Sequence, residues 1–368
     1  MIRARFFARS ALGLVLALGV AAGTAAPAMA KDKPAKEAKG PDLKPSKAFI
    51  PPYKAAQEAL VAAAKRADVV AAKQKLVAAQ NAYNAAGGKK ARADALTQVE
   101  AAQTELGTLL TNERGLVEAA ATAATTPDDK YLAGSLLLNL GNLGADKATQ
   151  RRGVQTQIDS GKLAAADLPK YNAILGSLSM DLKDYPTART ALKAALDAGY
   201  TENDVAILLA DAHIKDNQQA AGLKVLKDAS IAAGAAVPAD WLRYGVAVSY
   251  KAKLADDASW FSNTLTAYHP STENWSLAIA VVRDLRGFAG QDQIDLLRLM
   301  ERTKSFLEER DYVDYIQAAD PRRLPGEALK IVNEGLAAGK LNPADQFVTD
   351  AKAQASGRIA ADKASLPG

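Results

Sequence analysis

Apolar residues recur with helical spacing along most of this chain. Between Pro51 and Ala86 the sequence is dominated by Ala, Lys, Gln and Leu, which are strong helix formers. The apolar stripe of this stretch consists of Val69, Val70, Leu76, Val77 and Tyr83. Gly87-Gly88 ends the stretch, and a second amphipathic stretch begins near Lys90. Two long helical segments joined by glycines predict an antiparallel helical hairpin, and we assign residues 48–127 to it.

Shorter helical segments fill the chain after residue 127. Lys130 to Leu143 has the pattern of an apolar helix, and residues 146–160 form its expected partner. Gly161-Lys162-Leu163 ends that partner, and the same stop recurs as Gly339-Lys340-Leu341, which indicates an internal duplication. No segment alternates β-branched residues over the length of a strand, so the sequence predicts no sheet.

A period near 34 residues organises the chain between Leu168 and Pro270. The small residues Gly176, Ala210 and Gly245 are separated by 34 and 35 residues. Large residues follow them 16 positions later, as Leu192, Leu226 and Phe261. We expect the small residues to lie where the two helices of one unit cross, because a larger side chain would push those helices apart. The large residues are expected to fill the space between successive units.

The order of small and large positions in each unit resembles the tetratricopeptide repeat. A further copy is suggested by Tyr312, Ala328, Val332 and Gly335. The copies are divergent, since the early aromatic of the first helix is Trp241 in one copy but Asn172 and Ala206 in two others. The resemblance implies an all-α fold, a right-handed superhelical solenoid of antiparallel helix pairs over residues 128–342. The longer hairpin precedes this solenoid, and a C-terminal capping helix and tail over residues 343–368 follow it.

In the repeat family, ligands contact inward positions of the first helix of each pair. The resemblance implies that residues 170–181, 204–215 and 240–251 line a concave face. The candidate binding residues carried over in this way are Lys170, Ser177, Asp181, Asp204, Asp211, Lys215, Leu242, Val246 and Tyr250. They lack the Lys/Asn/Arg clamp of chaperone-binding relatives, so we expect a mixed apolar and charged groove for an extended or helical peptide. The alternative is that these positions are solvated faces without a ligand.

The first thirty residues have the pattern of a secretory signal peptide. The positive start is formed by Arg3, Arg5 and Arg9. Leu12 to Val20 is an apolar core too short for an ordinary membrane helix, and Ala28-Met29-Ala30 is a small-x-small cleavage site. The chain has no Cys, which excludes a lipoprotein anchor and disulfides. We therefore predict export to the periplasm of a Gram-negative bacterium, with a retained anchor helix as the alternative.

Residues 31–47 are rich in Lys, Pro and Ala and predict a disordered linker. It is expected to act as a solvated spacer or as a weak contact to anionic envelope surfaces. The net charge of +5 resides here and in the signal segment, which has three arginines and no acid, while residues 31–47 have six lysines and three acids. Subtracting +3 and +3 leaves about −1 for the remainder, which argues against nucleic acid as a partner.

Motifs for catalysis or metal binding are absent from the sequence. The chain has no Cys, only His213 and His269, and neither a phosphate-binding glycine loop nor a metalloprotease motif. We therefore predict no metal, no cofactor and no enzymatic activity, and we place His213 in the core between helices. The enzymatic alternative is a carboxylate pair brought together between repeats.

Aromatic residues gather between positions 241 and 275. The cluster consists of Trp241, Tyr244, Tyr250, Trp260, Phe261, Tyr268 and Trp275. Packing between units is one interpretation, because Trp241 and Phe261 fall on core positions of the repeat, and stacking on sugars is the other. The sequence thus predicts a non-enzymatic periplasmic scaffold that binds a protein or peptide in the cell envelope. The alternatives are a factor associated with peptidoglycan or polysaccharide, and an enzyme with an inter-repeat carboxylate site.

Overall fold

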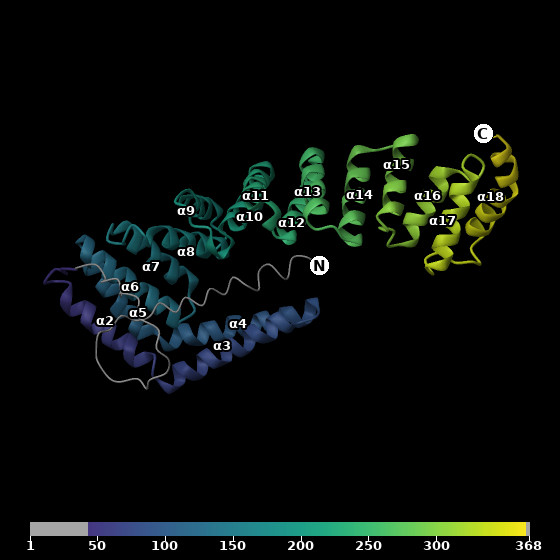
Figure 1. The fold of residues 1–368 in the computed structure, drawn as a ribbon. Coiled ribbons are helices and arrows are strands. Elements are labelled where there is room, and N and C mark those ends of the chain that lie inside the picture. Colours follow the sequence, from purple (N-terminus) through teal and green to yellow (C-terminus); the bar gives the residue numbers. More distant parts are fainter. Residues whose placement is uncertain (1–42, 366–368) are drawn as a thin grey trace, which may run out of the picture. The chain divides into compact units, whose positions relative to one another are not determined.

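The computed structural model describes residues 43–365, which contain seventeen α-helices and no β-strand (Figure 1). Successive helices pack against each other, as in a helical-repeat solenoid, so the predicted all-α fold is confirmed. The chain divides into two compact units, residues 1–212 and 213–368, and the boundary falls inside α10 (Val205–Lys215). The predicted signal peptide and residues 31–42 of the predicted linker lie outside the described residues. No described helix has both the length and the apolar character required to cross a membrane.

The first unit begins with four helices rather than with one hairpin. These are α2 (Ile50–Ala63), α3 (Ala67–Ala85), α4 (Lys89–Leu109) and α5 (Thr111–Ala123). The predicted helix from Pro51 to Ala86 is broken at Arg66, whose backbone is extended. The Arg66 guanidinium donates to the Leu109 carbonyl and pairs with Glu113, so contacts more than forty residues away in the chain fix this break. Helix α2 packs against α5 and α6, while α3 and α4 form the hairpin expected around Gly87-Gly88.

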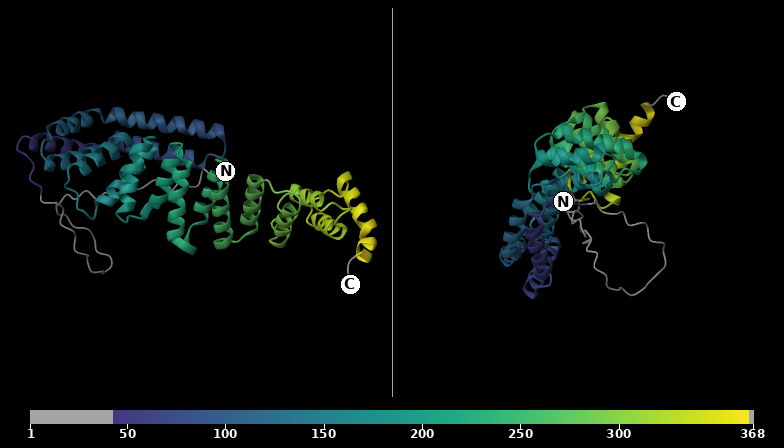
Figure 2. Two further views of the ribbon diagram at one scale, coloured as in Figure 1. Left: turned by 90° about the horizontal axis from the view of Figure 1, so that it is seen from above. Right: turned by 90° about the vertical axis from the view of Figure 1, so that its left-hand side faces the viewer.

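The hairpin of α3 and α4 is long and narrow, and the two helices run alongside each other (Figure 2). Its seam is built from Val69, Ala72, Leu76 and Ala79 of α3 and from Ala95, Ala102 and Leu106 of α4. Towards the Gly87-Gly88 turn the buried residues are only Ala79 and Ala95. The end of the hairpin therefore buries little apolar surface, which limits its stability.

The segment that precedes α2 is held against α6 (Pro127–Leu143). The backbone N–H of Lys44 donates to Asp128 Oδ2 at 2.9 Å, and that of Ser46 donates to Asp129 Oδ1 at 2.8 Å. Burial opposes ionisation of Asp129, but the hydrogen bonds from Ser46 and Thr126 outweigh it and lower the pKa of this carboxyl. The predicted linker therefore ends by Lys44 and not at residue 47.

Helix pairs follow in both units. The first unit continues with α7 (Lys147–Asp159), α8 (Leu168–Asp181) and α9 (Tyr185–Asp197), followed by a short 3-10 turn, η2 (Glu202–Asp204). The second unit contains α11 (Gln219–Ala233), η3 (Gly234–Ala236), α12 (Ala239–Lys251), α13 (Ala255–Tyr268), α14 (Thr272–Arg286), α15 (Gln291–Arg302), α16 (Glu309–Ala319), α17 (Pro325–Ala337) and α18 (Gln346–Ser365). Helix α18 covers α17 with Val348, Ala351 and Ala355, in the position of the expected capping helix.

The turn inside a pair is the same in four places. A residue with a left-handed backbone is followed by one whose N–H donates to the carbonyl five positions earlier, at 2.9 Å. The left-handed residues are Ala145, Lys183, Asn217 and Lys253, and the donors are Asp146, Asp184, Gln218 and Leu254. This pattern closes the first helix and satisfies a terminal carbonyl. The four turns are 38, 34 and 36 residues apart, close to the predicted period, and Lys304 and Ser305 form the same pattern between α15 and α16.

Glycines lie where the helices of a pair cross, as predicted from the sequence. A Cβ atom on Gly176 would lie 2.4 Å from Leu192 Cγ, and a Cβ atom on Gly245 would lie 2.4 Å from Phe261 Cδ1. The large residue of each pair therefore packs directly onto the small one of the same pair. In the α6–α7 pair, a Cβ atom on Gly153 would lie 2.6 Å from the backbone nitrogen of Leu138.

Polar side chains connect successive pairs at separations close to the repeat length. In the first unit, Lys147 pairs with Asp181 at 2.6 Å and a separation of 34 residues. Arg151 pairs with Asp184 at 2.6 Å and a separation of 33 residues. In the second unit, the Tyr250 hydroxyl donates to Asp284 Oδ2 at 3.0 Å, again 34 residues away. Each exposed link stabilises little by itself, but their recurrence shows that helices of successive pairs lie side by side within each unit.

Candidate protein-binding surfaces

The candidate residues of α8 lie on an accessible part of the first unit. Lys170 is exposed and Ser177 is half-buried. Asp181 is exposed at the end of α8, and its carboxylate accepts from Lys147 Nζ, so it also connects two pairs. These three side chains could contact a partner, with Lys170 as the cation.

The candidate residues around α10 differ in accessibility. Asp204 is exposed and closes the 3-10 turn before the helix, with a left-handed backbone at φ 54°. Asp211 is buried, with 9% of its surface exposed, so it is a poor contact residue. Lys215 is exposed at the last position of α10. The regular spacing of the sequence did not reveal this difference between Asp204 and Asp211.

Two of the three candidates in α12 belong to the core of the second unit. Leu242 is 0% exposed and Val246 is 1% exposed, so neither can contact a partner in this conformation. Helix α12 packs against α11, α13 and α14, which makes its buried face wider than expected for the first helix of a pair. Tyr250 is 42% exposed, and its hydrogen bond to Asp284 raises the pKa of its phenol.

The aromatic residues between 241 and 275 do not share one exposed face. Phe261 is fully buried, and the Trp260 ring meets it edge-on with centroids 4.9 Å apart. Lys227 Nζ lies 4.8 Å from the centre of the Trp260 ring, and Trp275 packs against the C-terminal core. The exposed members are Tyr250 and Tyr268, at the C-terminal ends of α12 and α13. Trp260 and Trp275 thus take part in packing, and all three tryptophans of the cluster are half-buried.

Each histidine contacts an oxygen atom of a turn or a helix end. His213 is half-buried rather than in the core, where it was predicted, and its Nδ1 lies 2.9 Å from Gln218 Oε1 in the turn after α10. His269 Nε2 lies 2.7 Å from the Val237 carbonyl and ties together the two ends of the α12–α13 pair. Among the described residues, no group of three His, Cys, Asp or Glu side chains could hold a metal ion.

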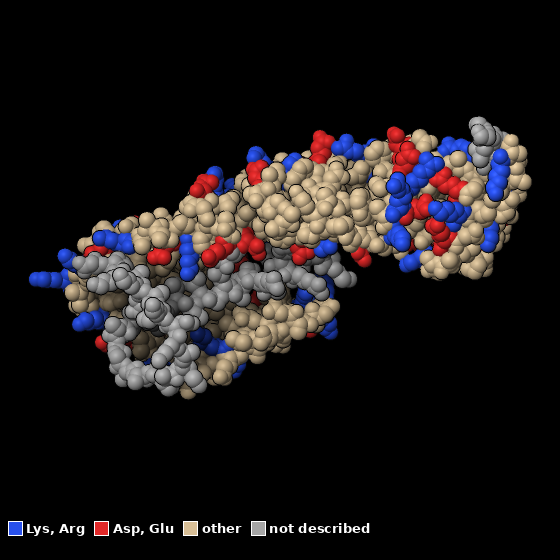
Figure 3. Space-filling view, viewed as in Figure 1, with Lys and Arg blue, Asp and Glu red and all other residues tan. Residues whose placement is uncertain are grey.

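Charged residues of both signs interleave over α15, α16 and α17 (Figure 3). Arg298 binds both oxygens of Glu327, at 2.7 Å and 2.8 Å, and the hydroxyl of the fully buried Tyr315 donates to the same carboxylate. The Arg298 hydrogen bond lowers the pKa of Glu327, while burial and the bond to Glu327 raise that of Tyr315. The network joins α15, α16 and α17 through side chains of all three helices.

The free energy of unfolding of the second unit is therefore expected to fall in acid, as Glu327 is protonated. Its pKa lies below the ordinary 4.5, so the stabilisation is complete above about pH 4.5 and is lost as the pH falls through the folded-state value. Glu327→Gln should cost about 1–2 kcal/mol at pH 7, since Arg298 is partly solvated. Denaturant unfolding at several pH values tests this: the gap between wild type and variant should close in acid. A gap that stays constant down to pH values well below 4.5 would contradict it.

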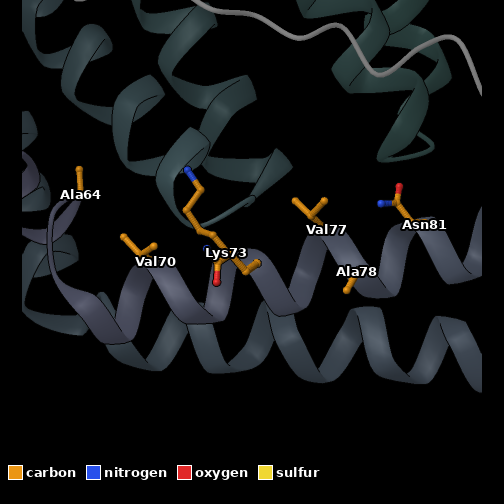
Figure 4. A pocket seen from close by; sticks show the side chains of 7 residues that line it. Ala64, Val70, Lys73, Val77, Ala78 and Asn81 are labelled. Atoms are coloured by element: carbon orange, nitrogen blue, oxygen red, sulfur yellow. The ribbon is translucent and has the colours of Figure 1, made fainter.

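A shallow, open groove runs along the exposed face of α3. The sequence pattern grouped this face with the buried apolar stripe of the same helix. It has a volume of about 520 Å³ and is lined by Ala64, Val70, Lys73, Gln74, Val77, Ala78 and Asn81. Figure 4 shows Val70, Lys73, Val77 and Asn81 projecting to one side of α3, away from α4. Two apolar doublets in the sequence, Val69-Val70 and Leu76-Val77, could have indicated this groove. In each doublet the first residue is buried and the second is exposed.

No protein-family model matches the chain, and no curated protein is significantly similar to it in sequence.

Proposed function

We propose that the chain is an exported, non-enzymatic scaffold that binds a protein or peptide segment on the exposed surfaces of its helix pairs. The pairs are proposed to be divergent tetratricopeptide-type repeats. The small-to-large contacts Gly176–Leu192 and Gly245–Phe261 support this, because they occupy equivalent positions of their units. The recurring left-handed turn and the links about 34 residues apart support it as well.

The observation that carries the proposal is the serial stacking of helices. Each helix mainly contacts its neighbours in the chain, and polar links join successive pairs. Such stacking presents an extended surface, which suits a peptide or protein segment better than a small substrate. The accessible candidate residues are Lys170, Asp181 and Asp204 in the first unit, and Lys215 and Tyr250 in the second.

Export is a separate part of the proposal and has its own test. If residues 1–30 are a signal peptide, protein isolated from the periplasm begins at Lys31. N-terminal sequencing and intact mass of the protein from fractionated cells measure this directly. A chain that keeps residues 1–30 and sediments with membranes would support a retained anchor instead.

Binding is tested by capture of the tagged full chain from its own cells, with matched variants. Lys170→Glu on α8 and Tyr250→Ala on α12 are each expected to reduce the captured partner by about tenfold. Lys193→Glu on α9 and Tyr268→Ala on α13 are the controls, because they change equally exposed residues on second helices. Equal losses in test and control variants, or no captured protein at all, would overturn the proposal.

A further inference from the structure

Helix α3 has two rows of side chains at helical spacing, an apolar one that packs on α4 and a mixed one that is exposed. Val69, Ala72, Leu76 and Ala79 form the seam that packs on α4. A second, exposed row lies beside it and consists of Val70, Gln74, Val77 and Asn81, with Val70 at 39% and Val77 at 54% exposure, so its apolar part is the two valines. Positions three to four residues apart are the spacing at which one helix packs on another. The exposed row therefore has the form of a docking face for a third helix.

The surroundings of this row are basic. Residues 69–93 contain Lys73, Lys75, Lys89, Lys90 and Arg92 and no acid. Lys75 pairs with Glu105 across the hairpin at 2.8 Å, while Lys73 lines the groove itself. Lys89, Lys90 and Arg92 are exposed at the start of α4. Lys75 is compensated by Glu105 and Asp94 follows Arg92, but a helix that docks here would still meet more cations than acids, with Lys73 in the groove itself.

Charge argues against occupants from this chain. A second copy of α3 on the same row would bring cations of both copies together, because α3 has only Asp68 as an acid, and Arg66 holds that side chain. Like charges at close range disfavour this association. In the proposed exported chain, residues 31–42 carry four lysines against three acids, so they offer no surplus of acid for this surface.

We propose that the groove on α3 binds an acidic amphipathic helix of a partner protein, which completes a three-helix bundle with α3 and α4. Apolar residues of that helix would contact Val70 and Val77, and its carboxylates would face Lys73 and the basic start of α4. The end of the hairpin buries only Ala79 and Ala95, so a third helix would supply the packing it lacks. This inference rests on the proposed scaffold function and assigns it a site and a class of partner.

The test uses the purified full chain and two synthetic peptides of about 20 residues. Both peptides are designed as amphipathic helices with leucines along one face. One peptide carries glutamates beside the leucines, and the other carries lysines at the same positions. The acidic peptide should bind about tenfold more tightly than the basic one, with an affinity that falls as salt rises. Hydrogen exchange of the amides between Leu76 and Ala85 should slow when the acidic peptide is added.

Matched variants locate the site. Val77→Asp changes an exposed groove residue and should weaken acidic-peptide binding by about tenfold. Leu96→Asp changes a residue on the same hairpin that is 45% exposed and does not line the groove, and it should leave affinity within about twofold. Hydrogen exchange measured without peptide checks that the α3–α4 hairpin remains folded in both variants.

Several results would overturn the inference: no binding of the acidic peptide at about 1 mM, equal affinity for both peptides, or equal effects of the two variants. Binding to anionic phospholipid vesicles that depends on Val77, without peptide binding, would show a membrane surface as the partner instead. If peptide binding behaves as expected but no cellular protein is captured, the scaffold function fails while the groove stands. If Lys170→Glu abolishes capture but Val77→Asp does not weaken peptide binding, the groove fails alone.

Discussion

Phe261→Ala is expected to destabilise the second unit by about 3–5 kcal/mol, the largest effect of any change considered. The Phe261 side chain is fully buried, fills the α12–α13 crossing and contacts the backbone at Gly245 and the ring of Trp260. Removing the ring opens a cavity that two packed helices cannot close. All three tryptophans lie in this unit, so denaturant unfolding followed by tryptophan fluorescence reports on it directly.

A double-mutant cycle separates this contact from general packing. Gly245→Ala alone should cost about 1–3 kcal/mol, because its Cβ would lie 2.4 Å from the Phe261 ring. In the Phe261→Leu background the same change should cost less, since the equivalent positions 210 and 226 carry Ala and Leu. A coupling of about 0.5 kcal/mol or more is expected. Additive effects would mean that the two residues do not contact each other as described.

Gly153→Ala is expected to destabilise the first unit, and this is the second large effect. Its Cβ would lie 2.6 Å from the Leu138 nitrogen and 2.8 Å from the Gly134 carbonyl oxygen, and neither backbone atom can move without shifting α6. The cost of about 1–3 kcal/mol outweighs the gain of less than about 1 kcal/mol from the helix propensity of alanine. Faster hydrogen exchange in α6 and α7 would show it.

Gly115→Ala is the matched control, because Gly115 lies inside α5 and nothing stands within 4 Å of an added Cβ. It is expected to stabilise the first unit by about 0.5–1 kcal/mol. The two substitutions are chemically identical and should differ in sign. If both stabilise, the close approach of α6 and α7 is contradicted.

The repeat could be predicted from the sequence because its signals are local. Spacing alone predicts that Gly176 lies where two helices cross, and the structure confirms this. The contact of Leu192 with Gly176 inside the same pair was not predicted, because Leu192 was expected to fill the space between successive units. The break at Arg66 was missed because good helix formers flank it, and because it is fixed by Glu113 and the Leu109 carbonyl, far away in the chain. No local pattern carries that information.

The binding surface was only partly predictable for a similar reason. Positions copied from a repeat pattern identify one side of a helix, but neighbouring helices decide how wide the buried face is. Leu242 and Val246 are core residues of a helix on which α11, α13 and α14 all pack, while Tyr250 stayed exposed. Val70 and Val77 were grouped with their buried neighbours, and only the position of α4 shows that they belong to a separate row.

The central claim is that the exposed faces of the helix pairs bind a protein. The most direct measurement is site-specific photo-crosslinking in intact cells, with the photoreactive residue placed in turn at Lys170, Tyr250, Lys193 and Tyr268. We predict discrete adducts with a protein from Lys170 and Tyr250, and much weaker adducts from Lys193 and Tyr268. Absence of protein adducts at all four positions, or adducts with cell-wall glycan alone, would contradict the claim.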